Sequence, residues 1–208
     1  MSEQKLDREV RREQIAEAAL ALVADRGLGR LNMAAVARRV GLVPSGIYRH
    51  FKNKEDLLLA LLDRIEARIL ENVRAAQEAT VDPLQRIHRV IVGHIRFIRE
   101  GRAVPRIIFS EDDHRGQPQR KARVERIVTA YLGHLAEFVR QGQRQGSIRR
   151  DVDPATAALL FLGIVVPAGI LWHLTEGGFD VTRHAERAWQ ICRRAIAAEG
   201  PPAPPPCE

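Results

Sequence analysis

The chain has 208 residues, 45% hydrophobic and 28% charged, a composition that excludes the fibrous and the intrinsically disordered classes. Its formal net charge of +7 favours a polyanionic partner, either nucleic acid or an anionic membrane surface. Two cysteines, Cys192 and Cys207, are too few for a disulfide framework or a metal cluster. The charged start of the chain has no apolar core of a signal peptide, so we expect a cytoplasmic protein.

The first 54 residues are predicted to form three helices joined by tight turns. Asn32 is a typical N-cap for the second helix, Gly41 ends that helix, and Pro44 fits the first position of the third. Phe51 is predicted to be a core residue at the end of the third helix. From the helical spacing of apolar residues, the three helices cover 8–26, 33–40 and 44–51.

The remainder of the chain also shows helical periodicity and no strand-period run, so we expect an all-α protein of about nine helices. Asn53, Asp82 and Asp153 are candidate N-caps. The 18 residues from Ala155 to Trp172 carry no charge, which is the lower edge of a membrane-spanning length. Because this segment contains Gly, Pro and Thr, we predict a helix buried on two sides and no membrane span.

The stretch from Arg26 to Lys54 combines two short helices, a glycine turn and a basic tail. It contains seven Lys or Arg residues and no acidic one. Two short helices around such a turn are typical of the helix-turn-helix, whose second helix enters the major groove of DNA. The net charge of 82–150 is higher, +8 against +3 for 1–60, so order and spacing support this hypothesis better than charge does.

Each residue of the predicted reading surface has an expected role. Val43 and Pro44 can make only apolar contacts, and Arg49 is the side chain that can read guanine with two hydrogen bonds. Tyr48, His50 and Lys54 are expected to hold phosphates. The predicted DNA-binding residues are Asn32, Val43, Pro44, Ser45, Gly46, Tyr48, Arg49, His50 and Lys54.

The same segment resembles the DNA-binding region of the tetracycline-repressor (TetR) family. The resemblance covers residues 8–60 in order and spacing. At three positions the sequence departs from the family's usual residues, with Asn32 for Thr, Val43 for Ser and Gly46 for Thr or Ala. The family pattern is matched by Asn32, Ala37, Gly41, Tyr48, Arg49, His50, Phe51, Lys54, Glu55 and Leu57.

The resemblance implies a ligand-responsive repressor that binds a palindromic operator as a homodimer, through helices near 154–174 and 181–198. It divides the chain into a DNA-binding domain, 1–54, and a ligand-binding and dimerisation domain, 55–198, with 55–77 as the connecting helix, while the proline-rich composition of 199–208 predicts a disordered tail. A small apolar or aromatic ligand is expected to bind in the second domain and to release the DNA. The candidate ligand-binding residues are His94, Phe97, Ile98, Phe109, Tyr131, Leu135, Phe161, Val165 and Trp172.

Other interpretations stay open. A DNA-binding regulator or architectural protein of the same fold without an effector fits the same residues, and so does an activator. An enzyme is not expected, because the sequence shows no set of nucleophile, base and orienting group, no phosphate loop and no metal spacing. The acidic cluster 111–114 is expected to be a solvated loop and no metal site, and we expect no cofactor. The basic block 82–150 is interpreted as a solvated face that could attract an anionic ligand.

Overall fold

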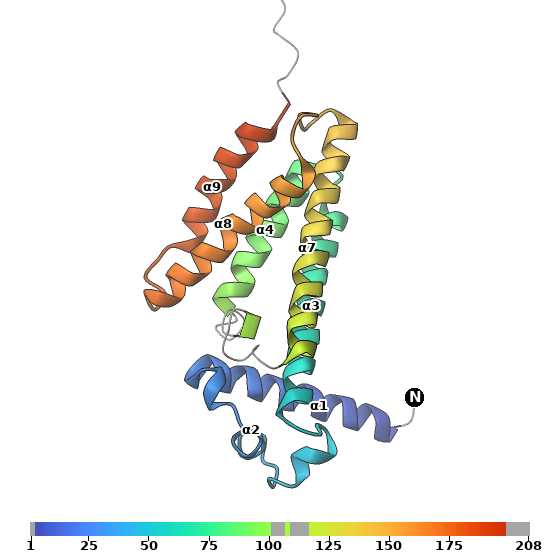
Figure 1. Cartoon of the computed structure of the whole chain (residues 1–208), viewed down its shortest axis with the longest axis vertical. Helices are drawn as coiled ribbons and strands as arrows, with labels where there is room; N and C mark the ends of the chain where they lie inside the picture. The colour runs from blue at the N-terminus through green and yellow to red at the C-terminus, as the bar shows by residue number, and fades with distance from the viewer. Residues whose placement is uncertain (1–2, 101–106, 109–116, 199–208) are drawn as a thin grey trace, which may run out of the picture. The chain divides into compact units, whose positions relative to one another are not determined.

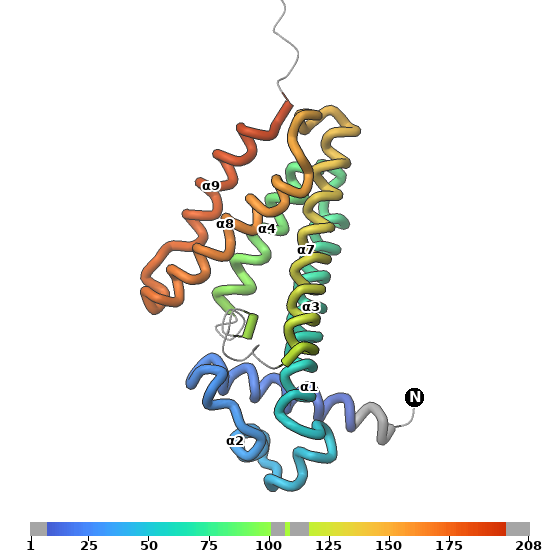
Figure 2. The backbone as a smooth tube through the Cα atoms, viewed as in Figure 1, coloured from blue at the N-terminus to red at the C-terminus, as the bar shows by residue number. Residues whose placement is uncertain are grey.

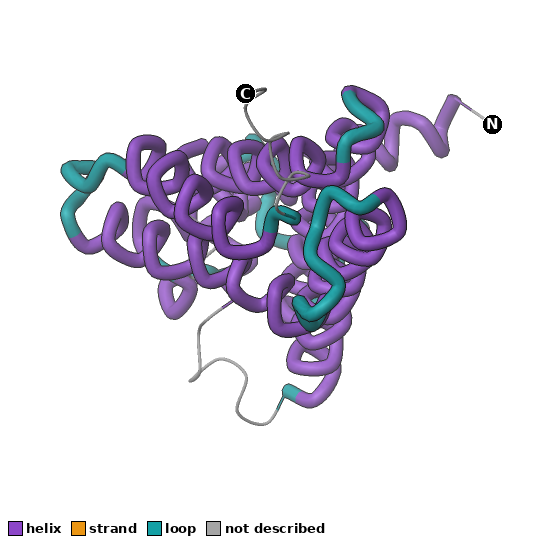
Figure 3. Tube along the Cα trace, turned by 90° about the horizontal axis from the view of Figure 1, so that it is seen from above, coloured by secondary structure: helices purple, strands orange, loops and turns teal. Residues whose placement is uncertain are grey.

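A computed structural model describes residues 3–100, 107–108 and 117–198. Over these residues the chain forms seven α-helices and two short 3₁₀ helices, and it forms no strand (Figures 1 and 3). This confirms the all-α prediction. Phe109, the acidic cluster 111–114 and the predicted tail 199–208 lie outside the described residues.

Contacts between residues divide the chain into two compact units. The first comprises residues 1–69 and 97–128, and the second comprises 70–96 and 129–208. Three helices contribute residues to both units. They are α3 (Lys54–Ala79), α4 (Pro83–Glu100) and α7 (Pro118–Gln145), and their course can be followed in Figure 2. The predicted functional boundary after residue 54 therefore stays a prediction.

The amino-terminal part of the first unit contains α1 (Glu3–Arg26), η1 (Leu28–Arg30), α2 (Met33–Arg39) and η2 (Gly46–Arg49). Their apolar faces meet the start of α3 in one core, whose large, fully buried members include Ile15, Ile47, Phe51, Leu57 and Leu61. The core is completed by residues from much later in the chain, because Ile107 and Ile127 are buried in it as well. The burial of Phe51 confirms its predicted place in the core.

Side-chain caps fix the starts of helices in this unit. Asn32 Oδ1 accepts a hydrogen bond from the backbone N–H of Ala35 at 2.8 Å, as predicted. Asn53 Oδ1 accepts one from the N–H of Asp56 at 2.8 Å, and the Asp56 carboxylate accepts one from the N–H of Lys52 at 2.9 Å. These reciprocal bonds fix the direction in which the chain enters α3.

Arginines at the start of α7 pair with acids of α3, all within the first unit. Arg120 Nε donates to Glu55, lying 3.0 and 2.9 Å from its two carboxylate oxygens. Arg120 is only 7% exposed, and its Nη1 is buried with no hydrogen-bond partner among the described residues. Two further pairs, Arg123–Asp63 and Arg126–Glu66, are more exposed.

The second unit contains α8 (Pro154–Leu174) and α9 (Val181–Ile196), which pack against each other (Figure 1). Asp153 and Asp180 cap these helices by accepting hydrogen bonds from the N–H groups of Thr156 and Arg183. One face of α8 is buried and the other exposes large apolar side chains. The exposed ones are Leu159, Leu160, Ile170, Leu171 and Leu174, together with Ile191 of α9.

Within the described residues, α8 is also the one helix long and apolar enough to cross a membrane by length and composition. The same properties are found in core helices of soluble proteins. Its seven buried residues support the core interpretation for one face. They are Ala157, Ala158, Phe161, Ile164, Val165, Ala168 and Gly169.

One element differs from its prediction. The third helix was expected over 44–51, but the structure has only the 3₁₀ segment Gly46–Arg49, after a turn at Pro44 and Ser45. Ser45 makes no capping hydrogen bond with its side chain, and Gly46 is among the weakest helix formers. A segment this short and uncapped forms 3₁₀ bonds more readily than an α-helix. The predicted count of nine helices is therefore slightly too high for the described residues.

Candidate DNA-binding site

The turn after α2 presents η2 at the surface. Gly41 has φ of 70°, the left-handed conformation that favours glycine, and the next N–H, of Leu42, donates to the carbonyl of Ala37 at 2.9 Å. The N–H of Gly46 then donates to the carbonyl of Val43 at 2.8 Å. Ile47 is fully buried and anchors η2 to the core of the first unit.

The predicted DNA-binding residues cluster on the exposed side of this segment. Val43 is 67% and Tyr48 54% exposed, unusual values for large apolar and aromatic side chains. In a 3₁₀ segment residues i and i+3 share a face, so Gly46 and Arg49 lie on the same face of η2. Of the nine predicted residues, Asn32, Val43, Pro44, Ser45, Tyr48 and Arg49 are exposed, and Gly46, His50 and Lys54 are half-buried.

Arginines of α1, which lie outside the predicted set of DNA-binding residues, contribute to the same surface. Arg12 donates to the carbonyl of His50, and its guanidinium lies 4.1 Å from the centre of the Phe51 ring. Arg8 reaches the carbonyl of Arg49 at 3.5 Å. The pattern Arg8, Arg11, Arg12 follows helical spacing and could have indicated a basic face of α1.

The surroundings of His50 disfavour the protonated form of its imidazole. Its burial, followed by the guanidiniums of Arg8, Arg11, Arg12 and Arg49, lowers the pKa of His50 below its ordinary value. Its Nδ1 is buried without a hydrogen-bond partner among the described residues. The ring is therefore suited to donate one hydrogen bond, and the arginines around it supply the positive charge that a phosphate group requires.

The predicted ligand-binding residues are only partly brought together. In the second unit, His94 Nδ1 lies 3.1 Å from the Tyr131 hydroxyl, and burial lowers the pKa of His94 to about 4 and raises that of Tyr131. Leu135, Phe161 and Val165 of this unit are also buried. Trp172 is half-buried near Gly177 at the end of α8.

Two of the predicted ligand-binding residues, Phe97 and Ile98, belong to the first unit, where the Arg68 guanidinium lies 4.9 Å from the centre of the Phe97 ring. A single pocket containing all nine predicted residues stays a prediction. In the described part of the chain, no three His, Cys, Asp or Glu side chains are grouped so that they could hold a metal ion.

An all-α chain with a capped short helix, a glycine turn and an exposed second segment among arginines has the architecture of a helix-turn-helix regulator of transcription. The chain belongs to the TetR family. The model of bacterial regulatory proteins of the tetR family matches residues 15–61, and that of a tetracyclin repressor-like C-terminal domain matches residues 80–196.

Proteins similar to this chain include regulators of transcription and nucleoid occlusion factors. The chain is 21% identical over 168 residues to the fatty acid metabolism regulator protein of Bacillus subtilis, covering 81% of this chain and 86% of that protein. It is 34% identical over 121 residues to the HTH-type transcriptional activator FasR of Mycolicibacterium smegmatis, covering 58% of this chain and 55% of the relative. The structure of FadR from Bacillus subtilis in complex with stearoyl-CoA has the same fold, with a TM-score of 0.77, 20% identity and coverage of 88% and 98%.

Proposed function

We propose that the chain is a ligand-responsive transcription regulator that binds a palindromic operator as a homodimer and is released from it by an acyl-CoA thioester. The observation that carries the DNA-binding part is the exposed segment from Val43 to Arg49, bordered by arginines of α1. Val43 and Tyr48 are large side chains that are more than half exposed, and a DNA groove would give the exposed part of each a partner.

The basic groups of the site fit contacts with phosphate. Arg8 and Arg49 are exposed, and Lys54 starts α3 with part of its side chain accessible. Each cation that neutralises a phosphate releases a counterion, so binding should weaken steeply as salt is raised. We propose Arg49 as the base reader and Tyr48, His50 and Lys54 as phosphate contacts.

The homodimer is supported by the exposed apolar face of α8 and α9. Isolated surface leucines are ordinary, but Leu159 and Leu160 are 60% and 59% exposed, and Leu174 and Ile191 add to the apolar surface of the same helix pair. A second copy of these two helices would cover the face and complete a four-helix interface with two-fold symmetry. Such a dimer requires operator half-sites about one helical turn, roughly 10 base pairs, or a multiple of it apart.

The acyl-CoA part of the proposal is supported by the chemistry of the second unit and by the relatives. Buried apolar residues and one neutral polar pair, His94 with Tyr131, suit an apolar chain that carries a single carbonyl group. One protein of the same fold binds stearoyl-CoA, and the relative from Bacillus subtilis regulates fatty acid metabolism. Acyl-CoA thioesters are therefore the first effectors to test.

The experiment is a fluorescence-anisotropy titration of the purified protein against the DNA upstream of its own gene, with random DNA of equal length as competitor. We expect preferential, salt-sensitive binding and its reversal by stearoyl-CoA, but not by coenzyme A or stearate alone. Arg49→Ala should alter the preference among operator variants. Arg183→Ala is the control, because it removes an exposed positive charge from α9, outside the DNA-binding segment.

Equal affinity for operator and random DNA at every salt concentration would refute the DNA-binding proposal. Operator binding that no acyl-CoA thioester reverses would refute the effector proposal and favour a regulator without an effector. A transcription assay with and without the ligand then distinguishes repression from activation, the activity for which the relative FasR is named.

A further inference from the structure

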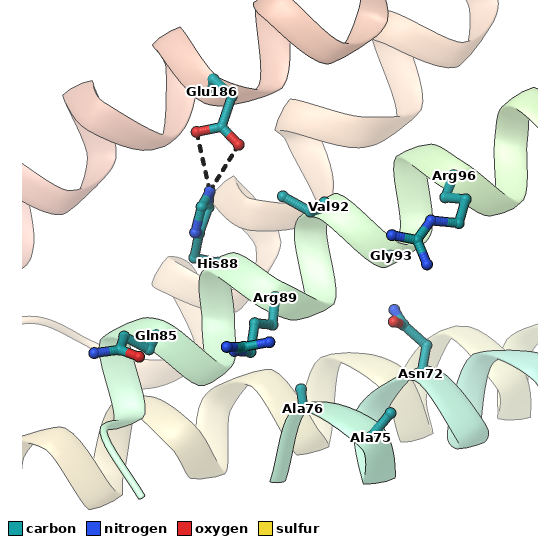
Figure 4. A pocket seen from close by; sticks show the side chains of 10 residues that line it. All are labelled: Asn72, Ala75, Ala76, Gln85, His88, Arg89, Val92, Gly93, Arg96 and Glu186. Carbon is teal, nitrogen blue, oxygen red and sulfur yellow. Dashed lines mark hydrogen bonds and ion pairs between the residues drawn. The ribbon is translucent and has the colours of Figure 1, made fainter. Parts of the chain in front are cut away.

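A groove of about 560 Å³ lies in the second unit between α3 and α4, with one residue of α9 at its edge (Figure 4). None of the predicted ligand-binding residues lines it. The lining residues from α4 lie on one helical face, and His94 lies on another. The ten lining residues are Asn72, Ala75, Ala76, Gln85, His88, Arg89, Val92, Gly93, Arg96 and Glu186.

Two exposed arginines of α4 give the groove its charge. Arg89 and Arg96 are seven residues apart, which is close to two helical turns, so they leave the same face about 10 Å apart along the axis. Figure 4 shows both along α4, across from Asn72 and Ala75 of α3. Neither guanidinium forms an ion pair or a hydrogen bond with another described residue, so both are available to an anionic ligand.

The one acid that lines the groove is already engaged. Both carboxylate oxygens of Glu186 lie within hydrogen-bond distance of His88 Nε2, at 3.0 and 3.1 Å. The His88 ring is in turn stacked on Trp189, with centroids 5.5 Å apart and planes at 14°. The stacking and the hydrogen bonds hold Glu186 to His88, so its carboxylate forms an ion pair with neither Arg89 nor Arg96.

Small residues provide the space, and neutral amides provide further polar groups. Asn72 Nδ2 donates to the carbonyl of Val90 at 2.9 Å, which holds the amide against α4. This approach requires Gly93, because a Cβ there would lie 1.8 Å from Asn72 Oδ1. Ala75 has no side chain long enough to fill the groove, and the exposed Gln85 offers an amide donor at one end.

We infer that this groove binds the phosphate groups of a nucleotide-bearing ligand through Arg89 and Arg96. A guanidinium donates two parallel hydrogen bonds to a phosphate, and two guanidiniums about 10 Å apart can hold two separate phosphate groups. The nucleotide of coenzyme A carries a phosphate monoester and a diphosphate, which fits this pair. The inference rests on the proposed acyl-CoA function and extends it by naming residues for the phosphorylated part.

The experiment measures binding of coenzyme A and of adenosine 3′,5′-bisphosphate to the full-length protein by isothermal titration calorimetry. The variant Arg89→Gln/Arg96→Gln removes both charges and keeps polar side chains. Arg99→Gln is the control, because Arg99 is exposed on the same helix but does not line the groove. We expect the double variant to lose about tenfold or more in affinity for both compounds, and the control to bind like the wild type.

Competition by inorganic phosphate at the same concentration as the nucleotide serves as the test of specificity. Unchanged affinity in the double variant, or binding that equimolar inorganic phosphate abolishes, would overturn the inference. If stearoyl-CoA releases DNA equally well from the double variant, the proposed function stands and the groove is not its phosphate site. If coenzyme A binds in an Arg89- and Arg96-dependent way but no thioester releases DNA, the groove is a phosphate site and the proposed effector is wrong.

Discussion

Replacing Glu55 by alanine leaves the buried guanidinium of Arg120 without its carboxylate. Arg120 is 7% exposed, and the ion pair with Glu55 is its one described salt bridge. Breaking a buried ion pair by removing one partner costs about 3–5 kcal/mol. Because the Glu55 side chain is 24% exposed, water can reach part of the site, so we expect the lower end, about 3 kcal/mol of unfolding free energy.

Replacing Arg120 as well removes the buried charge that Glu55→Ala leaves without a partner. Glu55→Ala/Arg120→Met leaves no buried charge and also removes Nη1, which has no hydrogen-bond partner among the described residues. We expect the double variant to lie within about 1 kcal/mol of the wild type, because apolar replacement of a buried ion pair is often neutral. The double variant should therefore be more stable than the single one.

Urea unfolding followed by circular dichroism measures both free energies. Asp63→Ala is the matched control, since it breaks the Arg123–Asp63 pair, whose side chains are 26% and 53% exposed, at an expected cost of about 0–1 kcal/mol. A double variant less stable than Glu55→Ala, or equal losses for Glu55→Ala and Asp63→Ala, would refute the reasoning.

Three further predictions follow from residues already described. Tyr48→Ala and Lys54→Ala should weaken binding to every DNA sequence, and Lys54→Ala should lower the slope of log affinity against log salt by about 1 in anisotropy titrations. Gly46→Ala should stabilise the protein by up to about 1 kcal/mol in urea unfolding, because the new Cβ would meet its nearest neighbour at 3.5 Å, an ordinary contact. Burial lowers the pKa of His94 to about 4, so the unfolded chain binds a proton there first as pH falls below about 6.5. Unfolding free energy should therefore fall by up to about 3 kcal/mol between pH 6.5 and 4, and His94→Gln should flatten this decline.

The parts of the fold that local chemistry controls could be predicted from the sequence. Asn32, Asn53 and Asp153 are caps in the structure because a cap depends on a few neighbouring residues. The glycine turn could be predicted for the same reason, because it depends on the positive φ of the single residue Gly41. The third helix differs from its prediction because Pro44 suits either a helix start or a turn, Ser45 makes no capping hydrogen bond with its side chain, and Gly46 is a weak helix former.

The features that the sequence did not show depend on residues far apart in the chain. Arg12 reaches the carbonyl of His50 across 38 residues, and His88 reaches Glu186 across 98. A sequence pattern within one helix or turn does not predict contacts between residues that are so far apart in the chain. Apolar spacing predicts that Phe161 is buried, but it does not predict whether the residue contacts a ligand, another core residue or both. The predicted pocket residues are mainly apolar and aromatic, with His94 and Tyr131 as polar groups, and a set of this kind does not include the exposed arginines Arg89 and Arg96.

The core of the first unit has a consequence for protein engineering. Ile107 and Ile127 fill positions in the same core as Phe51 and Leu57. A fragment that ends after residue 60 would keep every predicted DNA contact and lose these two side chains, together with the Arg120 partner of Glu55. Chimeric regulators that join this DNA-binding segment to a foreign sensor should therefore include the first turns of α7. Otherwise the apolar core residues that the truncation exposes should be replaced by polar ones.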